Sequence, residues 1–148
     1  WKTRTRRGSP LKKRWAGRRL RASELGDVAA STKIMLNVVD APTWPGPNMR
    51  AFELAACGAF SLTTRSPALL EIFTEGESVA CFDTADEARE VADRYLRDEA
   101  ARQSIARAGR EIVLAGHTWA HRVDTLVEWL AEDRSPAPGI ARAAPTAR

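Results

Sequence analysis

The first half of the chain alternates between amphipathic segments of helix length and apolar runs of strand length. The run KIMLNVVD over residues 33–40 is nearly all apolar, with Asn37 interrupting it, which is typical of a strand covered on both faces in a parallel sheet. A loop with three prolines and a glycine follows and cannot continue the strand. Ser23 is a candidate N-cap for the helix before this strand. The pattern predicts helix, strand, helix and strand over residues 22–31, 33–40, 48–57 and 59–63.

Capping residues mark the helix starts of the second half. Ser66-Pro67 indicates a helix start, because a proline at the first helical position loses no needed hydrogen bond. Thr84 with Glu87 fits a capping box, and Thr118 is a candidate N-cap for the last helix. This half therefore predicts a short helix after Ser66, a strand over 78–82, and helices over 85–96, 98–115 and from about 119 onward.

Strands alternating with helices predict an α/β fold. We expect a doubly wound, Rossmann-like parallel sheet with helices on both faces, ending in a helical segment. Ligands in such folds bind at the carboxyl ends of the strands. The loop after Asp40 and the helix starting at Asn48 therefore lie at the predicted ligand site.

Charge and composition divide the 148 residues into three regions. Residues 1–21 hold ten Lys or Arg and no acid, which leaves 23 − 10 = 13 basic against 19 acidic residues elsewhere, a balance of −6. Such a basic segment can bind nucleic acid, an anionic membrane surface or phosphate, or it can be a solvated loop. We expect a basic loop at 1–21, one domain at 22–132, and a disordered tail at 133–148.

Several kinds of site lack their signatures. The chain has no G-x-G-x-x-G or P-loop motif and nothing that resembles a nucleophile elbow. Cys57 and Cys81 have no metal-binding spacing, so we expect buried reduced thiols. His117 and His121 lie four apart without a third ligand nearby, so we expect no metal. No stretch approaches the roughly 20 apolar residues of a membrane span, and no signal peptide opens the chain, which predicts a cytoplasmic protein.

Arg50 and Glu53 allow two interpretations. They can form a surface ion pair at i, i+3, worth about 0.2–0.5 kcal/mol. Alternatively, the helix N-terminus and Arg50 face a diphosphate, and the Glu53 carboxylate accepts hydrogen bonds from ribose hydroxyls. The pattern of these residues alone does not separate the two.

Several motifs in one order extend the comparison beyond this helix. The chain resembles the carboxyl-terminal half of GT-B glycosyltransferases, in particular the group-1-like family that includes the spore-maturation-protein (CgeB-like) enzymes. The resemblance covers residues 1 to about 131, and Trp1 is similar to the end of the G-x-G-W turn of the family. It rests on IMLNV (34–38), NMRAFELAACGAF (48–60), LEIF (70–73), Tyr95-Leu96, ARAGR (106–110) and HTWAHRV (117–123).

The resemblance implies transfer of a sugar from a nucleotide-diphosphate donor to an unknown acceptor, with no cofactor and no obligatory metal. Glu53 matches the ribose-binding glutamate, and the backbone around Asn48, Met49 and Arg50 matches the phosphate-binding helix start. Related families often carry a second acid eight residues before that glutamate, near the donor sugar, where this chain has Pro45. The catalytic residues and acceptor site are expected on an amino-terminal half upstream of Trp1.

This chain alone is then expected to bind UDP-, GDP- or TDP-type nucleotides weakly and to transfer nothing. Two alternatives stay open: a non-enzymatic anion- or nucleic-acid-binding module that uses residues 1–21, and a degenerate transferase domain. The basic segment has only Trp1 and Trp15 as aromatic residues, so base stacking has little support and no nucleic-acid partner is expected.

Overall fold

The sheet at the centre of the domain is parallel throughout. The computed structural model describes residues 9–10, 14, 20–39 and 43–131. Within them, three strands lie in the order β1-β2-β3, with Leu36 opposite Leu62 and Leu62 opposite Ala80. The strands are β1 (Met35–Asn37), β2 (Ser61–Thr64) and β3 (Ala80–Phe82).

Helices connect and cover these strands, as the sequence pattern predicts. Parallel strands need a crossover connection, and α3 and α4 supply the two crossovers. The elements outside the sheet include the 3₁₀ turn η1 (Ala22–Glu24), α2 (Leu25–Ser31), α3 (Met49–Ala56), α4 (Pro67–Leu70), α5 (Ala85–Arg97), α6 (Glu99–Gly116) and α7 (Trp119–Ala131). The mixed α/β fold and the closing helix are confirmed.

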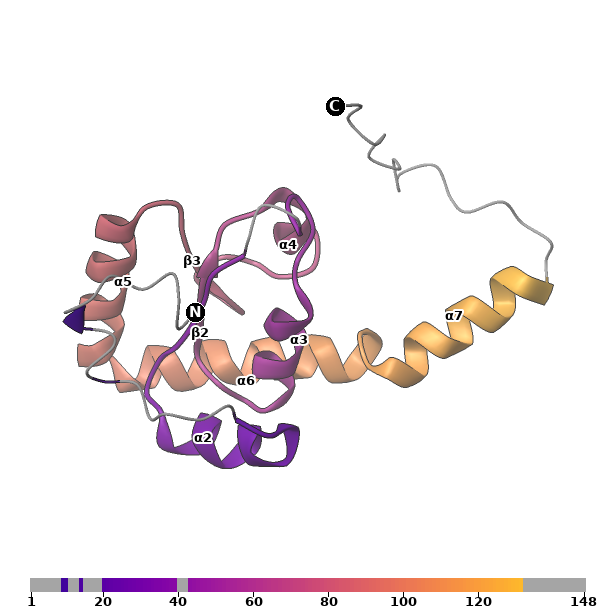
Figure 1. Ribbon diagram of the computed structural model, residues 1–148, viewed down its shortest axis with the longest axis horizontal. Coiled ribbons are helices and arrows are strands. Elements are labelled where there is room, and N and C mark those ends of the chain that lie inside the picture. The colour runs from indigo at the N-terminus through magenta and orange to yellow at the C-terminus, as the bar shows by residue number, and fades with distance from the viewer. Residues whose placement is uncertain (1–8, 11–13, 15–19, 40–42, 132–148) are drawn as a thin grey trace.

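Different helices pack on the two faces of the sheet. Figure 1 shows α5 on one side of the strands and α3 on the other. On the α5 side, Phe60, Leu62 and Phe82 pack with Ile105 of α6; the α3 side is lined by a second cluster. That cluster consists of Ala51, Ala55, Leu69, Phe73, Val79, Cys81 and Val113. In β3, Ala80 and Phe82 thus enter the first cluster and Cys81 enters the second, as the period of two requires.

Side-chain caps begin most of the helices. Asn48, Ser66, Thr84 and Asp98 each accept a hydrogen bond from a backbone N–H in the first turn of α3, α4, α5 and α6. The predicted N-cap at Ser23 is wrong, because η1 occupies that position and α2 begins after Glu24 without a side-chain cap.

Two burial predictions are also wrong. Cys57 is exposed, because it follows the last residue of α3 beyond the packed turns, whereas Cys81 is buried in β3 as expected. Strand β1 is shorter than predicted and is not covered on both faces. Leu36 is 60% exposed and Val38 64%, since α5 packs on β3, two strands away from β1.

Helix α7 extends from the end of α6 away from the sheet (Figure 1). None of its residues is buried, and its large apolar side chains are 40–75% exposed. No helix within the described residues is both long and apolar enough to cross a membrane. The predicted tail at 133–148 and most of the predicted basic segment at 1–21 lie outside the described residues, as does Asp40.

Candidate functional site

The N-cap of helix α3, Asn48, hydrogen-bonds Asn37, the last residue of β1, so the N-terminus of α3 lies at the carboxyl edge of the parallel sheet. Asn48 has an extended backbone, and its Oδ1 accepts a hydrogen bond of 3.2 Å from the N–H of Ala51. An α-helix leaves the N–H groups of its first turn without intrahelical partners. The Asn48 side chain accepts a hydrogen bond from the N–H group of Ala51, and the N–H groups of Met49 and Arg50 precede it on the same turn. This arrangement provides donors and a positive dipole end for an anion.

A pair of amide side chains fixes this helix start to the sheet. Asn37 in β1 donates from Nδ2 to Asn48 Oδ1 at 2.9 Å, and Asn48 Nδ2 donates back to Asn37 Oδ1 at 3.0 Å. Asn37 Nδ2 also donates to Thr63 Oγ1 in β2 at 2.8 Å. Asn37 and Thr63 are 4% and 0% exposed. The sequence does not predict this contact, although a lone amide inside an apolar strand is the signal that could have drawn attention to it.

Arg50 and Glu53 form the ion pair that their spacing allows. Arg50 Nη1 lies 2.8 Å from Glu53 Oε2, and the two side chains are 51% and 34% exposed. At this exposure the pair contributes little to stability. Both side chains therefore remain within reach of solvent and of a ligand.

The four predicted site residues divide between two hollows. Asn48 and Arg50 line a hollow of about 420 Å³ beside α2 and β1. Met49 and Glu53 line a second one of about 410 Å³. The second hollow is mostly apolar and includes Pro47, Phe52, Ala56, Val113, His117, Thr118, Trp119 and Arg122. Residues of α3 thus line both hollows, and the Arg50–Glu53 ion pair joins a residue of one to a residue of the other.

The junction between α6 and α7 forms one wall of the second hollow. The His117 ring stacks on Phe52 at a centroid distance of 5.7 Å, and His117 Nδ1 lies 2.7 Å from Arg122 Nη2. Burial lowers the pKa of His117, and the charges of Arg122 and His121 lower it further. The neutral ring can therefore accept a hydrogen bond from Arg122.

His121 has a different set of partners from His117. Its Nδ1 lies 2.7 Å from Thr118 Oγ1 and 3.3 Å from the backbone N of Thr118, at the start of α7. Among the described residues, no group of three or more His, Cys, Asp or Glu could hold a metal ion.

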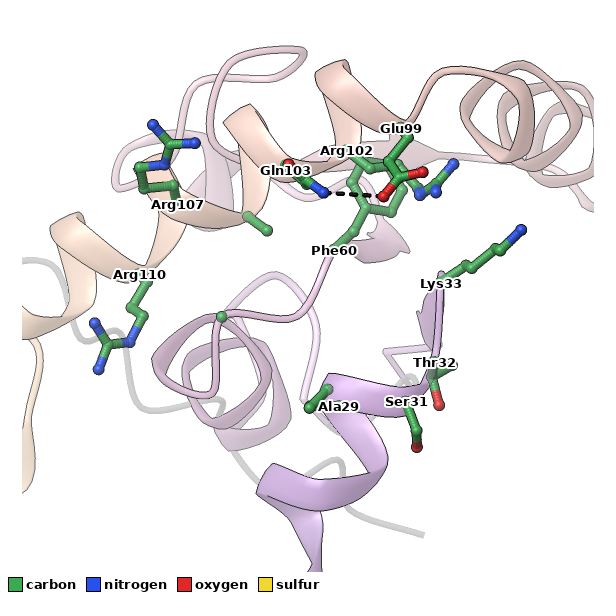
Figure 2. A pocket seen from close by; sticks show the side chains of 13 residues that line it. Ala29, Ser31, Thr32, Lys33, Phe60, Glu99, Arg102, Gln103, Arg107 and Arg110 are labelled. Carbon is green, nitrogen blue, oxygen red and sulfur yellow. Dashed lines mark hydrogen bonds between the residues drawn. The ribbon is translucent and has the colours of Figure 1, made fainter.

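A third hollow, of about 510 Å³, carries the most positive charge but lies at the opposite edge of the sheet. Its lining includes Lys33, Arg102, Arg107 and Arg110, and it faces the residues that precede β1 and β2. Figure 2 shows Lys33 and Arg107 extending toward opposite sides instead of converging. Arg102 donates to the Tyr95 carbonyl, and Arg110 Nε donates to the Ala56 carbonyl at 3.1 Å. These two arginines therefore connect elements of the fold, and none of the four predicted site residues lines this hollow.

A comparison with known protein families identifies the family of this chain. The model of a family described as glycosyl transferase-like matches residues 1–128. No curated protein and no solved structure matches the chain. Because the family match covers most of the 148 residues, this chain belongs to the glycosyl transferase-like family.

Proposed function

We propose that the chain is the donor-binding part of a GT-B glycosyltransferase of the CgeB-like kind, and that it binds a nucleotide-diphosphate sugar at the start of α3. The observation that carries this proposal is the position of α3. Its capped N-terminus lies at the carboxyl edge of a parallel sheet, with Arg50 and Glu53 on the first turn and a half. Membership of a glycosyl transferase-like family supports the reaction class.

Each group of this helix start has a role in the proposal. The N–H groups of Met49 and Arg50 and the Arg50 guanidinium face the diphosphate. Glu53 accepts hydrogen bonds from the ribose hydroxyls. The ion pair with Arg50 uses Oε2 of Glu53, so Oε1 can accept a hydrogen bond from a ribose hydroxyl without breaking that pair. The Asn48 side chain is assigned a positioning role, because its Oδ1 accepts from the N–H of Ala51 and from Asn37 while its Nδ2 donates to Asn37.

The chemistry proposed for this part of the enzyme is electrostatic. When the glycosyl bond breaks, negative charge develops on the leaving diphosphate. Fixed donors and a cation aimed at that charge stabilise the transition state without reorganisation. The proposal requires no metal, and it assigns the acceptor and any general base to an amino-terminal half. The protein is proposed to act in the cytoplasm.

Nucleotide titration of the full chain tests the proposal. Isothermal calorimetry with UDP, GDP and TDP should detect weak binding of at least one of them. Glu53→Ala should weaken that binding roughly tenfold or more, because a hydrogen bond to a charged group contributes about 1.5–3 kcal/mol. Glu90→Ala is the matched control, since Glu90 is an exposed glutamate on α5. Equal affinities for Glu53→Ala and the parent chain would count against the assignment.

A deletion separates this proposal from an anion-binding module built on residues 1–21. A chain that lacks these residues should keep its dependence on Glu53. If it loses all nucleotide binding, the basic segment and not α3 holds the nucleotide.

A further inference from the structure

Asn37 is a buried amide whose side chain joins the start of α3 to β2. It lies in the strand that leads to the site, 4% exposed, and its side chain bonds both to Asn48 and to Thr63. A buried polar group without partners costs about 1–3 kcal/mol, so this amide is tolerated because its partners satisfy it. An apolar residue would fill the same place without that requirement. The amide therefore specifies one arrangement of the elements that it joins.

The element that it joins to the sheet is the N-cap of α3. Asn48 Oδ1 accepts from both Asn37 Nδ2 and the N–H of Ala51, so one oxygen is shared between the strand and the helix. The return bond from Asn48 Nδ2 to Asn37 Oδ1 fixes the rotation of the Asn48 amide. Because a cap with a fixed amide also fixes the backbone that follows it, the direction of the Met49 and Arg50 N–H groups depends on Asn37.

We propose that Asn37 is a positioning residue of the nucleotide-sugar site, which acts through Asn48 and never touches the donor. This inference rests on the proposed function of α3. Binding is tighter when the donors are held in place before the ligand arrives, because less ordering is required on association. Loss of groups that orient metal ligands costs about 10- to 100-fold, and we expect a similar loss of nucleotide affinity here.

Three variants break different bonds of the same cluster, and a fourth lies outside it. Asn37→Ala removes the amide pair. Asn48→Ser keeps an oxygen for the Ala51 cap but lacks the amide group that donates to Asn37. Thr63→Val removes only the Thr63 acceptor and leaves the pair with Asn48 intact. Ile105→Ala removes buried apolar contacts on the opposite face of the sheet.

Nucleotide dissociation constants and melting temperatures of these full-length variants are measured together, well below the lowest melting temperature. Asn37→Ala and Asn48→Ser should each weaken binding by about 10-fold or more, and the double variant should bind no more weakly than either one. Thr63→Val and Ile105→Ala should lower the melting temperature while their affinity stays within about twofold of the parent.

The results distinguish this inference from the function on which it rests. A folded Asn37→Ala variant with parental affinity, alongside a Glu53→Ala variant that has lost affinity, overturns the role of Asn37 alone. Affinity that falls with melting temperature in all four variants also overturns it, because stability would then explain the loss. A parent chain that binds no nucleotide overturns both proposals. If Asn37→Ala does not fold, Asn48→Ser decides the question by the same comparison.

Discussion

Gly109 of α6 faces the backbone carbonyl of Ser78 so closely that a Cβ on Gly109 would lie 2.6 Å from the Ser78 oxygen. The same Cβ would lie 3.8 Å from the Cβ of Ala55 in α3. The absence of a side chain therefore lets α6 approach both the chain that leads into β3 and the helix that carries the candidate site. A glycine inside a helix is unfavourable by itself, so its presence here is explained by this close approach.

A Gly109→Ala substitution should lower the free energy of unfolding by about 1–3 kcal/mol, because an overpacked contact with backbone forces α6 or Ser78 to move. Gly116→Ala, in the same helix, is the control. Its added methyl group meets nothing within 4 Å, so the better helix propensity of alanine should leave stability unchanged or raise it by up to about 1 kcal/mol. Urea denaturation followed by circular dichroism measures both. Similar losses for the two variants would show that the contact with Ser78 does not explain the loss.

Arg65 should make the domain sensitive to acid. Its guanidinium binds Glu75, Asp83 and Glu87, with Nη2 2.7 Å from Glu87 Oε1. The hydrogen bond from Arg65, with a further one from the N–H of Asp83, lowers the pKa of Glu87 in the folded state. The stabilisation from this shift is present at neutral pH and is lost as the pH falls through the lowered pKa. The melting temperature should therefore fall on acidification below about pH 4.3, the ordinary pKa of a glutamate.

Arg65→Gln tests the source of that sensitivity. The variant should melt at a lower temperature at pH 7, because three neighbouring carboxylates lose their cation, and its further loss between pH 5 and pH 3 should be smaller. Arg89→Gln is the control, since Arg89 lies 3.9 Å from Asp86 in an exposed pair that should contribute little. If the melting temperature of Arg65→Gln falls as much between pH 5 and pH 3 as that of the parent, other carboxylates cause the acid sensitivity.

Local signals predicted the helix starts well. Ser66 and Thr84 begin their helices as the sequence indicates, and Asn48, predicted as the first residue of its helix, is the N-cap of α3. A cap involves residues within one turn, so its partners are close in the sequence. The capping box at Thr84 is the partial exception. Glu87 donates its N–H to Thr84 Oγ1, but its carboxylate accepts from the N–H of Asp83 while it also holds Arg65. The distant arginine determines where the carboxylate lies.

Contacts between distant residues were not predictable in the same way. The bond between Asn37 and Thr63 joins residues 26 positions apart, and no spacing rule relates them. The exposure of Leu36 was unpredictable for the same reason. An apolar run indicates a strand but does not indicate its place within the sheet. The sequence pattern thus predicted where α3 begins. The bonds that hold it there depend on strand order and register.

The two cysteines should react with thiol reagents at very different rates. Burial, together with the charge of Glu75, raises the pKa of the Cys81 thiol to about 12, whereas Cys57 is exposed at the end of α3. Because the thiolate is the nucleophile, iodoacetamide at pH 8 should modify Cys57 in the folded protein and Cys81 only after denaturation. Peptide mass spectrometry with and without urea checks this. Native labelling of Cys81 at the rate of Cys57 would contradict the packing of β3.

Leucines in α3 and α7 should differ in their contribution to stability. Leu54 in α3 is 1% exposed, whereas Leu126 and Leu130 in α7 are 52% and 75% exposed. Leu54→Ala should therefore cost about 2–5 kcal/mol through lost contacts and a cavity. The double variant Leu126→Ala/Leu130→Ala should change the free energy of unfolding by less than about 0.5 kcal/mol per site, because these side chains already contact water. Denaturation at two protein concentrations gives the comparison. A large loss in the α7 variant that grows with concentration would mean that another copy of the chain covers this face in solution.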